Sequence, residues 1–144
     1  TVKKDAAPEV EGMIGILEIP KIELKVAVVD GVDARSLKKA AGHFKETAYP
    51  GEKGNCAISG HRSFTYNQFF NRLNEVNQGD EISISTKTGN YKYVVYKKWI
   101  TDPNDISVLS KTDEDVITLI TCHPEHSSAQ RLIIRGRLEF KTSP

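Results

Sequence analysis

The sequence lacks what a disulfide-held fold, a nucleic-acid binder or a membrane-spanning chain requires. It has only two cysteines in 144 residues, too few for a small scaffold held together by disulfides. Its 20 basic and 19 acidic residues nearly cancel to a net charge of +1, and no long basic stripe occurs. That balance argues against nucleic acid as a partner. No apolar run approaches the roughly 18 residues that cross a bilayer.

The beginning of the chain shows no secretory signal peptide, and it starts with Thr1 rather than Met. We therefore expect a trimmed fragment that has lost any N-terminal targeting or anchoring segment. Residues 1–12 are polar and contain Pro8 and Gly12, which predicts a tail or linker stub. Residues 13–144 are expected to form one domain, because the length and the 38% hydrophobic and 27% charged fractions suit a single globular core.

The hydrophobic pattern predicts a chain made mostly of strands. Short runs rich in Val, Ile, Thr and Tyr are expected to form strands at residues 13–19, 23–29, 55–60, 81–85, 91–100, 116–121 and 131–140. Helices are predicted at residues 33–41 and 67–76, the second from an apolar stripe of Phe69, Phe70, Leu73 and Val76. One helical turn is expected within the connection 101–115. The fold class is therefore all-β with short flanking helices, as a closed or nearly closed β-barrel.

One thiol lies where a nucleophile would be useful. The β-prone run Thr118-Leu119-Ile120-Thr121-Cys122 is followed by a polar segment that extends to Gln130. A cysteine at the end of a buried strand is partly exposed and near cationic side chains, which favours the reactive thiolate. Taken alone, a cysteine is more often a small buried hydrophobe, so its neighbours must decide.

Two further residues complete a candidate catalytic set with Cys122. His61 also follows a short strand and precedes a polar segment, so it can face the same rim of a barrel and act as the base that a catalytic thiol needs. Arg131 begins the next strand and can return its guanidinium to that rim, where an oxyanion develops. Arg135 shares its strand face but lies about 13 Å further along, at roughly 3.3 Å per residue. We therefore expect Arg135 to be a solvated surface charge.

Other interpretations of the two cysteines stay open at this level. A Cys56–Cys122 disulfide would consume the candidate nucleophile, and the surroundings of Cys56 favour a buried, inert thiol. Cys122, His123 and His126 provide too few ligands for a convincing metal site, with no second cluster to complete it.

Three motifs in this order make the sequence similar to the sortases, a family of cysteine transpeptidases on Gram-positive cell surfaces. Residues 118–122 match the TLxTC signature, residues 55–62 resemble the histidine segment, and residues 131–134 resemble the arginine strand. The resemblance covers residues 13–140, which would then be the catalytic domain. Class D is the most similar subclass and class A the next, because the sequence has no long helical insertion and no N-terminal Asp-Pro-aromatic lid.

The resemblance implies an eight-stranded sortase-type β-barrel and an acyl-transfer reaction. Cys122 would attack the Thr carbonyl of a Leu-Pro-X-Thr-Gly or Leu-Pro-X-Thr-Ala sorting signal. His61 would protonate the leaving amine, and Arg131 would hold the substrate backbone and the oxyanion. An amine of peptidoglycan or its lipid-linked precursor, such as diaminopimelate, would resolve the thioester. No metal or organic cofactor is required for that chemistry.

The resemblance also suggests a substrate groove and a location. By position, the family lines its groove at Ser59, Ile120, Thr121 and Ile133. In the connection 101–115, the side chains expected to wall a Leu-Pro pocket are Ile106, Val108 and Leu109. The partners would be the sorting-signal peptides of secreted surface proteins. The enzyme would work at the extracellular face of the plasma membrane of a Gram-positive bacterium, with its anchor outside this sequence.

Two different functions remain as alternatives. A hydrolytic cysteine protease with the order His then Cys would use the same residues, although such caspase-like folds are α/β and the predicted strands argue against one. A β-barrel binding module would use Cys122 only as a core residue, and its thiol would then react no faster than a buried one.

Overall fold

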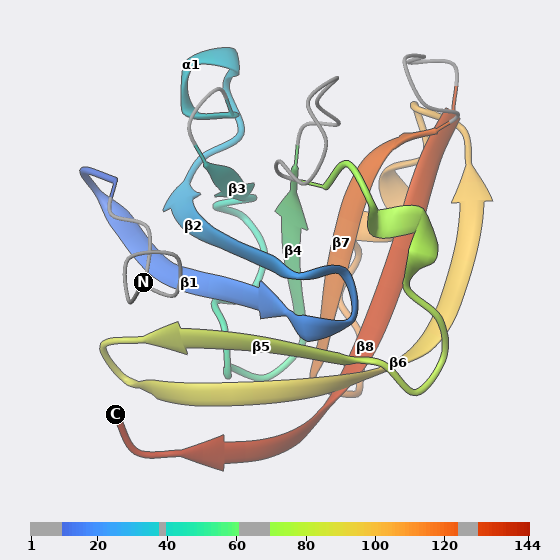
Figure 1. Cartoon of the computed structure of the whole chain (residues 1–144). Coiled ribbons are helices and arrows are strands. Elements are labelled where there is room, and N and C mark those ends of the chain that lie inside the picture. Colours follow the sequence, from blue (N-terminus) through green and yellow to red (C-terminus); the bar gives the residue numbers. More distant parts are fainter. Residues whose placement is uncertain (1–9, 38–39, 61–69, 124–129) are drawn as a thin grey trace.

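The computed structural model describes residues 10–37, 40–60, 70–123 and 130–144, with the backbone alone for Ala34, Ser36, Cys122 and His123. Within these ranges eight strands close into a barrel in the order β1-β2-β3-β4-β7-β8-β6-β5 (Figure 1). The strands are β1 (Met13–Ile19), β2 (Leu24–Asp30), β3 (Ala41–His43), β4 (Asn55–Ser59), β5 (Glu81–Thr86), β6 (Gly89–Thr101), β7 (Val116–His123) and β8 (Gln130–Thr142). The predicted closed, eight-stranded all-β fold is confirmed.

Alternation along the strands fills the barrel interior. In β5, Ile82 and Ile84 are fully buried, while Glu81 and Ser85 on either side of them are exposed, as a half-buried strand requires. The same pattern in the other strands produces one large apolar cluster, which includes Leu17, Ile19, Ile58, Ile117, Leu119, Leu132 and Ile134. This cluster is the main core of the domain.

A second apolar cluster lies on the outer side of the barrel wall. Ala57, Ile120 and Ile133 come from β4, β7 and β8, and each alternates with residues of the main core. Val108 covers them from the 3₁₀ helix η4 (Ile106–Leu109), which confirms the helical turn expected between β6 and β7. Three adjacent strands therefore present an apolar outer face that a short helical segment partly covers.

The first predicted helix is shorter than expected. Helix α1 spans only Ala34–Leu37, and Ala41–His43 form strand β3, which pairs in parallel with β2. A Cβ at Gly42 would lie 2.2 Å from the Gly31 carbonyl oxygen, so the close approach of the two backbones needs this glycine. Strand pairing therefore overrides the local helical preference that the sequence indicates.

The second predicted helix is also wrong in its described part. Residues 70–76 contain only a 3₁₀ helix, η3 (Leu73–Glu75), while Phe69 lies outside the described residues. Phe70, Leu73 and Val76 are all fully buried. Their spacing of three residues suits the threefold period of a 3₁₀ helix as well as an α-helical stripe, so the apolar pattern indicates burial correctly and the helix type wrongly.

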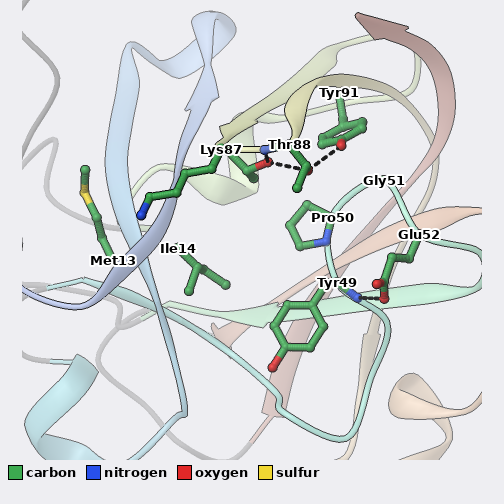
Figure 2. Close-up of a pocket in the computed structure, with 10 residues that line it drawn as sticks. Met13, Ile14, Tyr49, Pro50, Gly51, Glu52, Lys87, Thr88 and Tyr91 are labelled. Atoms are coloured by element: carbon green, nitrogen blue, oxygen red, sulfur yellow. Dashed lines mark hydrogen bonds between the residues drawn. The ribbon is translucent and has the colours of Figure 1, made fainter. Parts of the chain in front are cut away.

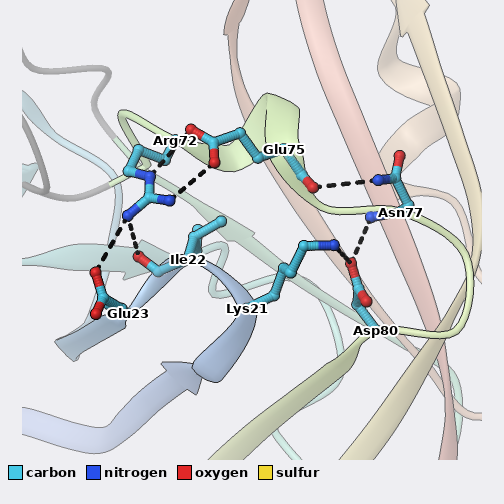
Figure 3. A network of polar contacts seen from close by, with 7 residues as sticks. All are labelled: Lys21, Ile22, Glu23, Arg72, Glu75, Asn77 and Asp80. Atoms are coloured by element: carbon cyan, nitrogen blue, oxygen red, sulfur yellow. Dashed lines mark hydrogen bonds and ion pairs between the residues drawn. The ribbon is translucent and has the colours of Figure 1, made fainter.

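A polar network joins the segment around η3 to the turn between β1 and β2 (Figure 3). The Arg72 guanidinium donates two hydrogen bonds to Glu75, at 3.0 and 2.8 Å, and one to the Ile22 carbonyl oxygen at 3.4 Å. Lys21 in the 3₁₀ helix η2 (Pro20–Ile22) forms an ion pair with Asp80 at 3.3 Å. These contacts fix the chain that follows residues 61–69.

The described part of the chain begins at Val10, which packs against Ala27, Val29 and Ala40 on the outside of β2. Residues 1–9 of the predicted tail lie outside the described residues. Among the helices described, none is long and apolar enough to cross a membrane.

Candidate active site

The ends of two parallel strands bring the predicted cysteine and histidine segments to one rim of the barrel. β4 and β7 run in parallel with Ser59 opposite Ile120, and both strands end toward the top of the view in Figure 1. The Gly60 amide extends this pairing by donating to the Ile120 carbonyl oxygen at 3.1 Å. Cys122 lies two residues beyond Ile120 in the sequence, and His61 lies two beyond Ser59. His61 itself is outside the described residues.

The cysteine and the preferred arginine occupy facing positions of a strand pair. Cys122 is the Cα partner of Arg131 in the antiparallel pairing of β7 and β8. The Arg131 side chain is partly buried, and its Nη1 atom lies 3.4 Å from the Gln130 carbonyl oxygen, to which it donates. The backbone therefore places a guanidinium-bearing residue directly across from the thiol-bearing one.

An open groove of about 290 Å³ lies beside this rim, over the outer apolar face. Seven residues predicted for the site line it: Ser59, Ile106, Val108, Leu109, Ile120, Arg131 and Ile133. Thr121 does not line it. Its side chain is only 2% exposed, because alternation along β7 turns it away from the face of Ile120. Phe44, Thr101 and Asp105 line the groove as well, and sequence analysis did not single them out.

One wall of the groove is the 3₁₀ helix η4, which is capped at its start by Asp105. The Asp105 carboxylate accepts hydrogen bonds from the Ser107 amide at 3.0 Å and from the Thr101 hydroxyl at 2.5 Å. A hydrogen bond from the Ser107 hydroxyl contributes most, and together with these two bonds it lowers the pKa of Asp105 below its usual range. The cap ties η4 to the end of β6, and Ile106 next to it is 79% exposed. An apolar side chain so exposed at a groove mouth is available for contact with a ligand.

Arg135 lies behind the η4 wall and is hydrogen-bonded there, so the expectation of a solvated surface charge is wrong. Its Nε donates to the Thr118 hydroxyl at 2.9 Å, and its Nη2 donates to the Val108 carbonyl oxygen at 3.2 Å. The guanidinium also lies 5.3 Å from the centre of the Trp99 ring. Spacing along the strand put Arg135 far from the catalytic rim and so suggested solvent, but η4 folds back and contacts it.

The second cysteine is free and buried, as expected. Cys56 lies in β4 with no exposed surface and forms no disulfide. Burial raises the pKa of the Cys56 thiol far above its ordinary value, with a smaller contribution from the charge of Glu52. Cys56 is therefore unsuited to nucleophilic chemistry, and the alternative of a Cys56–Cys122 bridge is excluded.

A close contact limits the size of the residue that follows β4. Gly60 is buried, and a Cβ at this position would lie 2.3 Å from the ring of the fully buried Phe70. Glycine is therefore needed directly before His61, for space rather than for backbone conformation. The motif Ser59-Gly60-His61 thus has a steric reason at its middle position.

His43 is buried in β3, the strand that pairs with β4. His43 has no exposed surface; its Nδ1 lies 2.8 Å from the Asp30 carboxylate and its Nε2 lies 2.8 Å from the Ala48 carbonyl oxygen. Each ring nitrogen thus faces an oxygen atom of a neighbouring residue at hydrogen-bond distance. Burial alone would raise the pKa of Asp30, but hydrogen bonds from Tyr49 and His43 outweigh it and lower that pKa overall. His43 is thus a structural residue of β3.

A larger cavity of about 600 Å³ opens elsewhere and contains none of the predicted site residues. It lies between the start of β1, the loop around Pro50 and the β5–β6 hairpin, with Tyr49, Pro50, Lys87 and Tyr91 around it (Figure 2). Within the described part of the chain, no group of three His, Cys, Asp or Glu side chains is arranged to hold a metal ion.

The closed barrel corresponds to that of a known class of enzymes. The sortase domain model matches residues 17–139, and the chain belongs to the sortase family of cysteine transpeptidases. Sortase D of Bacillus subtilis is 34% identical over 139 residues, which cover 94% of this chain and 68% of that protein. Sortase A of Listeria monocytogenes is 26% identical, covering 96% of this chain and 62% of that protein.

Solved structures agree with the sequence relatives. A Listeria monocytogenes sortase A structure superposes with a TM-score of 0.88 at 25% identity, covering 93% of this chain and 92% of that one. A Clostridium perfringens sortase D5 transpeptidase gives a TM-score of 0.81 at 32% identity, covering 92% and 83%. The described barrel thus matches those of solved sortases along nearly its whole length.

Proposed function

We propose that the chain is a transpeptidase that cleaves a Leu-Pro-X-Thr-Gly or Leu-Pro-X-Thr-Ala sorting signal after Thr and transfers the acyl group to a cell-wall amine. The observation that carries this proposal is the pairing of Cys122 with Arg131 at one end of an apolar groove. A nucleophile, a cation for the oxyanion and a surface for an aliphatic peptide thus converge on one rim.

The acylation step assigns one role to each catalytic residue. The Cys122 thiolate forms a bond to the Thr carbonyl carbon, and Arg131 stabilises the negative charge that develops on the carbonyl oxygen. His61, as an imidazolium, donates its proton to the departing amine nitrogen as the peptide C–N bond breaks. The product is a thioester on Cys122 with neutral His61, and the C-terminal part of the signal leaves as a free amine.

The transfer step reverses these roles. An incoming amine attacks the thioester carbonyl and gives its proton to His61, which now acts as a base. The C–S bond breaks, an amide forms, and Cys122 returns to the thiolate with His61 protonated. Because both steps use the same pair, the resting ionisation belongs to the Cys122–His61 pair and not to either residue alone.

The groove suits the apolar half of such a signal. Ile120 and Ile133 form its floor, and Val108, Leu109 and the exposed Ile106 form one side. An extended peptide with Leu-Pro over these side chains would bring its Thr carbonyl toward Arg131. Ser59 at the end of β4 would contact the peptide backbone. We assign no contact to Thr121, whose side chain is buried away from the groove.

The partners and location follow from the same proposal. The acyl donors would be secreted surface proteins, and the acceptor an amine of peptidoglycan or its lipid-linked precursor, such as diaminopimelate. The enzyme would act at the extracellular face of a Gram-positive plasma membrane. Its 34% identity to Bacillus subtilis sortase D supports a class D assignment.

Product analysis tests this function. Peptides ending in Leu-Pro-X-Thr-Gly or Leu-Pro-X-Thr-Ala are incubated with the protein, with and without diaminopimelate, and the products are weighed by mass spectrometry. We expect cleavage after Thr and, with the amine present, a new amide in place of the free acid. Cys56→Ala, which removes the buried thiol, should keep this activity. Cleavage at another bond, or hydrolysis that the amine never intercepts, would contradict transpeptidation.

A further inference from the structure

We infer that Arg135 is a specificity-determining positioning residue: through a closed hydrogen-bond ring it holds the η4 wall at the distance that selects the apolar part of the peptide. We call the four residues Asn55, Val108, Thr118 and Arg135 the Arg135 network. The inference rests on the sorting-signal function proposed above and identifies what sets the width of its groove.

The Arg135 network is a continuous ring of donors and acceptors. Arg135 Nε donates to the Thr118 hydroxyl at 2.9 Å, and that hydroxyl donates to Asn55 Oδ1 at 2.6 Å. Asn55 Nδ2 donates to the Val108 carbonyl oxygen at 2.9 Å, and Arg135 Nη2 closes the ring on the same oxygen at 3.2 Å. Thr118 thus acts as both acceptor and donor, and the Val108 carbonyl oxygen accepts two hydrogen bonds.

The ring connects the rigid barrel to the groove wall. Asn55, Thr118 and Arg135 come from β4, β7 and β8, which are adjacent in the barrel. Val108 belongs to η4, and Asn55 Nδ2 also donates to the Ser110 carbonyl oxygen at 3.0 Å, just after that helix. Thr118 is fully buried and Asn55 is 3% exposed, so these bonds are shielded from competing water. Three strands therefore fix the end of η4 through side chains.

Arg135 acts on the groove from behind. It is not among the described residues that line the groove, whereas Val108 and Leu109 are. Its guanidinium spans Thr118 and Val108 with two nitrogens in a fixed fork, and it rests near Trp99. Lysine at this position would keep the charge but lose the fork, which would let η4 move away from the floor formed by Ile120 and Ile133.

A coupling experiment separates this role from a general effect on folding. Wild type and Arg135→Lys are assayed with the signal peptide and with a peptide whose Leu is replaced by Ala, giving KM and kcat for each pair. Arg137→Lys is the matched control, because Arg137 lies on the same face of β8 but pairs with Glu114 at 3.1 Å at the surface. The alkylation rate of Cys122 with iodoacetamide is measured in every protein.

We expect Arg135→Lys to raise KM for the Leu peptide by about tenfold, the equivalent of one lost hydrogen bond, with kcat and the alkylation rate near wild type. The Leu-to-Ala change in the peptide should then matter less than in wild type, because the wall no longer fits Leu. Arg137→Lys should behave as wild type. Because Arg135 does not line the groove, coupling between position 135 and the peptide Leu requires the wall as intermediary.

Two results would overturn the inference. If wild type is fully active, unchanged KM and unchanged Leu selectivity in folded Arg135→Lys would show that the ring does not set the width of the groove. A parallel fall of kcat and of Cys122 alkylation would place Arg135 at the thiol instead. If Arg135→Lys does not fold, Thr118→Val breaks the ring at a buried position of similar volume and decides by the same two readouts. A wild-type protein that no signal peptide acylates would overturn both this inference and the proposed function.

Discussion

Cys122 and Arg131 are directly opposed residues of the antiparallel strands β7 and β8. The Cα atoms of opposed residues in such a pair lie about 4.5–5.5 Å apart, close enough for a guanidinium to reach a group bound at the facing residue. Eleven residue pairs join β8 to β6 on its other side, so the arginine strand is anchored along most of its length. The proposed oxyanion donor is therefore held by the barrel and not by a loop.

Replacing the two arginines of this face should have different effects. Arg131→Ala is expected to lower kcat/KM by about 10²–10³ while leaving thermal unfolding near that of wild type, because it removes a transition-state contact at the rim. Arg135→Ala should lower kcat/KM less, by about tenfold through KM. It should also lower the free energy of unfolding by about 1–3 kcal/mol, since the Thr118 hydroxyl and the Val108 carbonyl oxygen lose a donor. Peptide-cleavage kinetics and urea unfolding of both variants check this. Equal losses of rate in the two variants would contradict the choice of Arg131.

The two thiols should differ sharply in reactivity. Burial raises the pKa of Cys56 and removes it from solvent, so native protein should take up one equivalent of iodoacetamide, on Cys122. Protein unfolded in guanidinium chloride should take up two, one for each cysteine in the sequence. Mass spectrometry of alkylated peptides measures both states. Labelling of Cys56 in folded protein would show that β4 opens locally, and a native Cys122 as slow as Cys56 would support the binding-module alternative.

The steric role of Gly60 predicts a strong effect from a small change. Gly60→Ala places a methyl group against the Phe70 ring, and overpacking of this kind costs about 1–3 kcal/mol of stability. Because the chain reaches His61 at the next residue, peptide cleavage should fall as well. The double variant Gly60→Ala with Phe70→Leu should recover part of the unfolding free energy, because the smaller leucine leaves room for the methyl group. Additive effects of the two changes would mean that the contact does not limit this site.

Asp30 should make the stability of the fold depend on pH in acid. Its pKa in the folded protein is below the ordinary 3.8, so the carboxylate stabilises the fold above that value. This contribution is lost as the pH falls through the folded-state pKa, because the native state must then bind a proton. Asp30→Asn should therefore be less stable than wild type at about pH 6, and the difference should shrink at about pH 3. A difference that does not change with pH, measured by urea unfolding, would mean that the carboxylate charge plays no part.

Much of the fold follows from strand periodicity in the sequence. The run 13–19 matches β1 at both ends, and 81–85 and 116–121 fall within β5 and β7. Strand β3 was missed because Ala41-Gly42-His43 has no β-branched residues, and its pairing depends on the contact of Gly42 with the distant Gly31. Helix propensity at residues 33–41 is a local signal, and it loses to this non-local pairing.

The candidate site, like the fold, could be predicted only in part from the sequence. Motif spacing was enough to propose His61, Cys122 and Arg131. The family resemblance suggested Ile120 and Ile133, which line the groove, and also Thr121, which is buried away from it. The roles of Asn55 and Arg135 were not visible, because they depend on where η4 folds back over β7 and β8. In a sequence, an asparagine at the start of one strand and an arginine in the middle of another are both common at the protein surface. Only the path of the connection turns them into the support of a groove wall.

The most direct test of the central claim is the intact mass of the protein after brief incubation with a Leu-Pro-X-Thr-Gly peptide. The account predicts a mass increase equal to the peptide through its Thr residue, carried by Cys122 and released by diaminopimelate. Cys122→Ala should show no adduct although it remains folded, and Cys56→Ala should show the same adduct as wild type. An adduct that persists in Cys122→Ala, or none in folded wild type whose Cys122 is alkylated readily, would contradict acyl transfer through this thiol.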